Sequence, residues 1–182
     1  MYRMAWHPLA AAAMAAVALA LAGGPAVAEL AGTPTILDGD TIELDGQVLH
    51  LQGIDAPELG QQCTIKGQAY DCGLVSRTAL MDLTAGTPVV CTLAGRRAGG
   101  QPADEDEGAP ALCSADGYDL SEGMTYTGWA LVERAAPAPE AARYAARVDG
   151  ARQARRGLWR GRFIAPWAWR TGARLGIEDT AQ

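Results

Sequence analysis

Short runs of apolar and β-branched residues, separated by polar and glycine-containing segments, recur along this chain, which is the pattern of strands joined by turns. The stretches 33–37, 41–44 and 48–51 come first, and 87–93 and 110–114 follow further along. An Asp-Gly pair separates the second stretch from the third and strongly favours a tight hairpin turn. We therefore expect an antiparallel hairpin whose two outer ends lie at the same edge of a sheet.

Helical spacing of apolar residues predicts three helices between and after these strands. The first covers 73–83 and the third covers 140–156, with Gly157 as its C-cap. The second opens at Asp119, which forms a capping-box pattern with the acid three residues later, and is expected to continue to Leu131.

The remaining segments read as irregular structure. Residues 59–71 are polar and contain glycine, and residues 94–109 hold only small apolar side chains and a run of four acids, so both are predicted to be loops. Residues 29–32 look like a loose start. The element count describes a small α+β domain with about three helices, and a five-stranded OB-type barrel would fit it.

The N-terminal 28 residues have the pattern of a secretory signal peptide. A basic residue precedes a short alanine-rich apolar run, and an Ala-x-Ala site ends at Ala28. The apolar run is short for a membrane anchor, so we expect no stable anchor and a periplasmic or secreted protein.

Four cysteines follow the predicted signal segment, an even number that favours two disulfides in an oxidising compartment. Three pairings of four cysteines exist. We favour Cys63 with Cys72, which closes a short loop, and Cys91 with Cys113, which joins two predicted strands.

Charge is distributed unevenly along the chain. Residues 29–132 hold sixteen acidic residues against four basic ones, whereas the chain from 133 onward holds ten arginines against five acids. Because phosphate backbones bind basic surfaces, the acidic body disfavours nucleic acid as a partner unless the arginine-rich part folds back.

Three carboxylates stand at the ends of the predicted hairpin. Asp40 precedes its first strand, while Asp55 and Glu58 follow its second strand and should return to the same edge. Carboxylates gathered in this way need a compensating cation, protons or arginines. Hard oxygen ligands favour Ca²⁺ or Mg²⁺, so these acids are candidate metal ligands, with solvated loop acids as the alternative.

Several motifs together resemble the staphylococcal-nuclease-like (thermonuclease) family. They are Asp38-Gly39-Asp40-Thr41, Gly53-Ile54-Asp55-Ala56-Pro57-Glu58, Gly128-Trp129-Ala130, Gly157-Leu158-Trp159 and Pro166-x-x-Trp169-Arg170. The resemblance spans about 33–170, and residues 171–182 are expected to form a disordered tail. It implies an OB-fold barrel with three helices and, in active members, a Ca²⁺-dependent phosphodiesterase that acts on DNA and RNA.

The resemblance also implies roles for individual residues. Asp40, Asp55 and the main-chain carbonyl of Ala56 would bind Ca²⁺, and Glu58 would act as the general base toward water. Such an arrangement makes chemical sense, because a hard cation polarises phosphoryl oxygens while a nearby carboxylate accepts the proton of water.

The chain departs from the family at both phosphate-binding arginines. His50 occupies the position of the first, and Gly108 or Ala109 that of the second. Phosphoryl transfer depends on cations placed around the phosphate, and one lost donor costs on the order of 10²–10³ in rate. A protonated His50, or Arg96 and Arg97, would have to compensate.

Three hypotheses follow from these observations. The first is an exported, monomeric thermonuclease-like protein that keeps its metal-binding carboxylates but has weak or lost nuclease activity. The second is an active Ca²⁺-dependent phosphodiesterase that uses His50 as a catalytic residue, or Arg96 and Arg97. The third is a non-catalytic binding module of the cell envelope that uses the aromatic, arginine-rich C-terminal segment.

Overall fold

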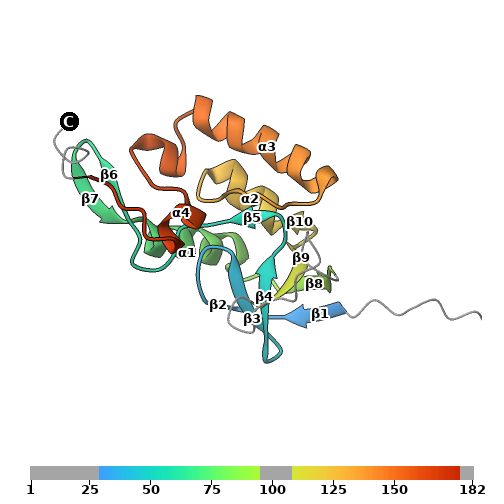
Figure 1. Cartoon of the computed structure of the whole chain (residues 1–182). Coiled ribbons are helices and arrows are strands. Elements are labelled where there is room, and N and C mark those ends of the chain that lie inside the picture. Colours follow the sequence, from blue (N-terminus) through green and yellow to red (C-terminus); the bar gives the residue numbers. More distant parts are fainter. Residues whose placement is uncertain (1–28, 95–107, 177–182) are drawn as a thin grey trace, which may run out of the picture.

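The chain folds as a mixed α+β structure in which a curled sheet is covered by helices (Figure 1). The computed structural model describes residues 29–94 and 108–176. The predicted signal segment, Arg96 and Arg97 and the acidic run 104–107 lie outside the described residues. So does half of the expected C-terminal tail, residues 177–182.

The main sheet contains seven strands, and one of its pairings is parallel. Its order is β1-β8-β9-β4-β3-β2, with β10 added on β9, and the β4–β9 pair is the parallel one. The expected five-stranded barrel stays a prediction. The strands are β1 (Glu29–Gly32), β2 (Thr35–Ile36), β3 (Thr41–Leu44), β4 (Gln47–Leu51), β8 (Val89–Leu93), β9 (Ala109–Ala115) and β10 (Tyr118–Asp119).

The predicted hairpin is confirmed and forms β3 and β4. Asp45 (φ 53°) and Gly46 (φ 74°) have the two successive positive φ angles that a two-residue hairpin turn of this type requires. The register places Thr41 opposite His50. The outer ends of the hairpin, where Asp40 stands, therefore lie together at one edge of the sheet.

Two segments predicted to be irregular are strands. Residues 59–71 contain the hairpin β6 (Gln62–Ile65) and β7 (Gln68–Asp71), which turns at Lys66 and Gly67, both with positive φ. Residues 29–32 pair along β8 as β1. Both predictions were wrong because these strands are largely polar or alanine- and glycine-rich, so apolar alternation is weak.

All three predicted helices are present, with different ends. They are α1 (Cys72–Thr84), α2 (Leu120–Thr127) and α3 (Ala138–Gln153), and two short elements follow, η1 (Gly157–Arg160) and α4 (Pro166–Arg170). The capping prediction at Asp119 is confirmed, since its Oδ1 accepts a hydrogen bond from the backbone N–H of Glu122 at 2.9 Å.

The predicted ends of the second and third helices were wrong, and glycine conformation explains one of them. Gly128 adopts φ 82° and ends α2, after which the chain extends into β11 (Leu131–Val132) and pairs with β5 (Ile54–Asp55). Helix α3 is capped at Ala154, so Gly157 does not cap it and instead begins η1.

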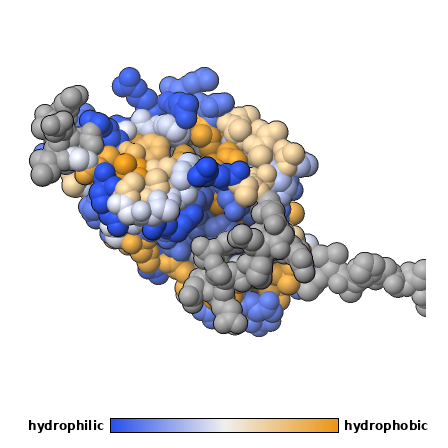
Figure 2. Space-filling model, in the orientation of Figure 1, coloured by the Kyte–Doolittle hydropathy of each residue, from blue (hydrophilic) through white to orange (hydrophobic). Residues whose placement is uncertain are grey.

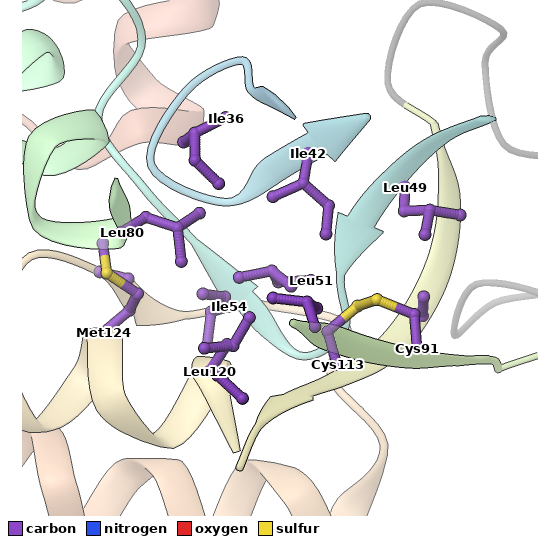
Figure 3. Packing of buried hydrophobic residues seen from close by; sticks show 14 of the residues in the cluster. Ile36, Ile42, Leu49, Leu51, Ile54, Leu80, Cys91, Cys113, Leu120 and Met124 are labelled. Atoms are coloured by element: carbon purple, nitrogen blue, oxygen red, sulfur yellow. A yellow bond between two sulfur atoms is a disulfide. The ribbon is translucent and has the colours of Figure 1, made fainter. Parts of the chain in front are cut away.

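The core lies between the curled sheet and helices α1 and α2 (Figure 3). Ile42, Leu49 and Leu51 of the sheet are fully buried, as are Leu80 of α1 and Leu120 of α2. Burying a large aliphatic side chain contributes about 1.5–3 kcal/mol, so this cluster is a main source of the free energy of folding.

Both predicted disulfides are confirmed. Cys91 and Cys113 face each other across β8 and β9 within the core (Figure 3). Cys63 and Cys72 join β6 to the start of α1 beside Leu158. Two disulfides are compatible with the expected extracellular or periplasmic location. None of the described helices has the length and apolar character needed to cross a membrane.

Candidate functional site

Asp40 is held at the edge of the hairpin by the backbone around it. The backbone N–H of Ala56 donates to Asp40 Oδ2 at 2.5 Å, and the Asp40 carbonyl accepts from the N–H of Leu51 at 2.7 Å. The preceding Gly39 is required, because a Cβ there would collide with Ser76 of α1. These contacts fix one acid of the predicted set beside the loop that carries the other two.

The Asp40 carboxyl is buried, with 7% of the residue exposed. Burial is the main cause of a pKa well above the ordinary aspartate value, and the charge of Asp38 raises it further. The charge of Asp55 adds to the increase, so Asp40 and Asp55 lie close enough to interact. The hydroxyl of Thr41 donates to the other oxygen, Asp40 Oδ1, at 3.0 Å.

Asp55 and Glu58 share one arginine that the sequence analysis did not assign to the site. Arg170 donates from Nη1 to Asp55 Oδ1 at 2.9 Å and from Nη2 to Asp55 Oδ2 at 2.8 Å, a two-pronged contact. Its Nη1 also donates to Glu58 Oε1 at 2.5 Å. Charge-assisted, bidentate contacts of this kind are the strongest hydrogen bonds that side chains make.

Exposure differs among the three side chains of this cluster. The Asp55 side chain is 6% exposed, that of Glu58 is 33% and that of Arg170 is 42%. Burial raises the pKa of Glu58 even though Arg170 opposes the shift. The hydrogen bonds to Asp55, followed by those to Glu58, raise the pKa of Arg170, which is therefore always charged. One resident guanidinium thus faces two acids.

Arg170 reaches the acids because its segment is tied to the β6–β7 hairpin. The backbone groups of Thr64 and Arg162 exchange two hydrogen bonds of 2.9 Å, and the Gln61 side chain donates to the Ile164 carbonyl at 2.7 Å. A Cβ at Gly161 would collide with the Thr64 carbonyl, so this close approach needs glycine. Helix α4 then begins at Pro166 and ends at Arg170.

His50 lies next to Asp40 and points into the protein. Its Nε2 is 3.2 Å from the carbonyl oxygen of Ile54, and its Nδ1 is 3.6 Å from Asp40 Oδ1. A carbonyl only accepts, so Nε2 carries the proton in this contact. The side chain is 13% exposed.

Of the two positions matched to the second arginine, Gly108 and Ala109, the first has no room for one. Gly108 has φ 76°, and a Cβ there would lie 2.8 Å from the Val48 carbonyl oxygen of β4. The next residue, Ala109, pairs with Leu49 in β9. An arginine at Gly108 would therefore need a different backbone, whereas Arg96 and Arg97 lie outside the described residues.

The described side chains do not fit a divalent cation as they are arranged. Within residues 29–94 and 108–176, no group of three or more histidine, cysteine, aspartate or glutamate side chains is placed to hold one. The donor chemistry suits a hard ion, but both oxygens of Asp55 accept from Arg170, and Asp40 accepts from Ala56 and Thr41. The N–H of Ala56 holds Asp40, and the role expected of the Ala56 carbonyl stays a prediction.

Sequence reasoning missed Arg170 because nothing local links it to Asp55. The two residues are 115 positions apart, and the motif that contains Arg170 gave it no role beside the carboxylates. One signal was available: buried acids gathered at an edge need a cation, and the arginines of this chain are concentrated in its C-terminal part.

A cavity of about 540 Å³ lies away from the carboxylates. It is bordered by Glu29 of β1, Leu112 of β9 and Glu140 and Arg143 of α3. In Figure 2, hydrophilic residues at the top of the view and pale orange, weakly hydrophobic ones to their right cover the region of α3. None of Asp40, His50, Asp55 and Glu58 lines this cavity.

No protein-family model matches the chain. A stretch of 67 residues is 43% identical to the succinoglycan biosynthesis protein ExoI of Rhizobium meliloti (strain 1021). The match covers 36% of this chain and 35% of ExoI, so the chain spans about a third of that relative.

Proposed function

We propose that this chain is an exported thermonuclease-like protein, built on an OB-type barrel, whose nuclease activity is weak or lost. The observation that carries the proposal is the pairing of the site acids. Asp55 and Glu58, which would serve a nuclease as ligand and base, are both engaged by Arg170.

The surroundings of the acids support the same proposal. A phosphodiesterase needs positive groups directed at the phosphate. At the position of one such arginine, His50 directs its Nε2 to the Ile54 carbonyl, and at the other, Gly108 packs against β4. Two lost donors, each with an effect on the order of 10²–10³, would leave little rate enhancement.

DNA cleavage tests this proposal directly. The protein is expressed from the full sequence, purified, and incubated with plasmid and single-stranded DNA in millimolar Ca²⁺. We expect cleavage no faster than that of Glu58→Gln. Glu43→Gln is the matched control, because Glu43 is an exposed acid on β3. Robust cleavage that is lost in Glu58→Gln and retained in Glu43→Gln would overturn the proposal.

An active Ca²⁺-dependent phosphodiesterase is the second candidate, and Arg170 favours it. Its side chain is 42% exposed and its guanidinium binds Glu58, so a phosphate approaching the acids would meet it. This candidate predicts DNA cleavage that falls in Arg170→Gln, His50→Ala or the double replacement of Arg96 and Arg97 by alanine. If cleavage is unchanged in all three variants, none of these side chains supplies the positive charge at the phosphate that this candidate requires.

A further inference from the structure

We propose that Arg170 is the built-in cation of this site: its guanidinium binds Asp55 and Glu58 in place of a divalent ion, and it must leave before such an ion binds. This proposal rests on the proposed function only because both concern the same acids, Asp55 and Glu58. It concerns binding of the ion, so it can be tested without any nuclease assay.

The hydrogen bonds of Asp55 carry the first step. Both of its oxygens accept from Arg170, at 2.9 and 2.8 Å, and Glu58 Oε1 accepts from the same guanidinium at 2.5 Å. An ion that bound these oxygens would need the space and the lone pairs that Arg170 uses. Binding of the ion and of the guanidinium to these atoms is therefore mutually exclusive.

Tethering gives Arg170 an advantage over a free ion. A group on the same chain acts at an effective concentration of about millimolar or more when its anchor is placed correctly. The anchor here is the segment held to β6 by the Thr64–Arg162 pair and the Gln61–Ile164 hydrogen bond. A dissolved divalent ion has to compete with a cation that never diffuses away.

Exposure shows how the exchange would take place. The Arg170 side chain is 42% exposed and stands at the end of α4, so it can rotate into water without unfolding the segment. Asp55 is buried and stays in place, paired through β5 with Leu131 of β11. The arginine is therefore the partner that would leave, while Asp55 keeps its place.

Calorimetric titration with CaCl₂ tests the proposal. We expect Arg170→Gln to bind Ca²⁺ at least about tenfold more tightly than the wild type, since it removes the competing charge. Arg174→Gln is the matched control: it makes the same charge change four residues on, at an exposed arginine stacked on Trp169 at 3.5 Å. Adding Asp55→Asn to Arg170→Gln should abolish the gain.

The melting temperature provides a second readout and guards against a variant that folds poorly. Arg170→Gln should melt below the wild type without Ca²⁺ and should rise with added Ca²⁺ by more than the wild type or Arg174→Gln does. Arg170→Lys keeps the charge and loses the planar fork, so its affinity should lie between the two.

Two results would overturn the proposal. One is Ca²⁺ affinity in Arg170→Gln no greater than in the wild type and Arg174→Gln, and the other is a gain that survives Asp55→Asn. Failure of the proposed function looks different: the wild type would cut DNA rapidly, whatever the ranking of Ca²⁺ affinities among the variants.

Discussion

Two clusters of this protein pair acids with arginines from a later helix, and they depend on those arginines to different degrees. In the α2–α3 cluster, Arg143 and Arg147 of α3 bind Asp119 and Glu122 at the start of α2, with Arg147 Nη2 2.5 Å from Glu122 Oε1. In the α4 cluster, Arg170 binds Asp55 and Glu58. The arginines are similarly exposed, at 47%, 48% and 42%.

The acids of the α2–α3 cluster have other favourable partners. Asp119 caps α2 through the N–H of Glu122, and Tyr144 donates its hydroxyl to Asp119 Oδ2 at 3.0 Å. Both acids also lie at the positive end of a helix. Loss of an arginine here leaves each acid in a position that still favours its charge.

Apart from Arg170, the charged groups around the acids of the α4 cluster are mainly other acids. The charges of Asp38 and Asp55 raise the pKa of Glu58, and they also raise the pKa of Asp40. Loss of Arg170 would therefore leave like charges facing each other beside a buried carboxyl. The same type of ion pair clamps two helices in one cluster and offsets repulsion in the other.

Removing the buried acid of the α4 cluster should have the largest effect. We expect Asp55→Ala to lower the free energy of unfolding by about 2 kcal/mol, because two charge-assisted hydrogen bonds are lost at a buried position. Urea denaturation measures this. The partly exposed arginine can rehydrate, which limits the loss. A change below about 0.5 kcal/mol would contradict the comparison.

The pH dependence of stability should reveal the repulsion around Asp40. Its pKa is raised by burial, so the folded state holds the proton more tightly than the unfolded chain, whose aspartates titrate near about 3.9. The extra stability is present below that value and is lost as the pH rises through the raised pKa.

Urea denaturation across this pH range, in the wild type and in Asp40→Asn, measures the effect. The fall in the free energy of unfolding with rising pH should be shallower in Asp40→Asn. Asp116→Asn, at an exposed turn residue with positive φ, is the control and should keep the wild-type slope. Equal slopes in all three proteins would show that the surroundings of Asp40 do not raise its pKa.

Removing an arginine from the α2–α3 cluster should have the smallest effect. We expect Arg147→Ala to change the free energy of unfolding by about 0–1 kcal/mol, since the pair is solvent-screened and Glu122 keeps its place at the helix start. The effect should shrink in 1 M salt, because the Debye screening length is then only about 3 Å. A loss as large as that of Asp55→Ala would erase the distinction between the clusters.

Local signals predicted the parts of the fold that local chemistry determines. Asp45-Gly46 specified the hairpin, Asp119 specified the start of α2, and the cysteine spacing favoured the two disulfides that form. The β6–β7 hairpin escaped because its strands are polar. The end of α2 was missed because Gly128 looked tolerable within a helix, whereas its left-handed φ ends one.

The site was only half predictable for a similar reason. Asp40, Asp55 and Glu58 stand in a short stretch whose hairpin brings them together, so sequence alone placed them at one edge. Arg170 joins them through the anchoring of its segment at Thr64, a tertiary contact that no local pattern encodes. The sequence therefore predicted the acidic side chains of the site but not the arginine that pairs with them.

The span of the Arg170 contact also sets an order of events during synthesis. Arg170 and Asp55 are 115 residues apart, so the guanidinium leaves the ribosome long after its acids. The β3–β4 hairpin and its neighbours can pack first, with the acids of the site not yet compensated by Arg170. A contact with this sequence separation also raises the contact order of the fold, and closing so long a loop costs conformational entropy before the contact can form.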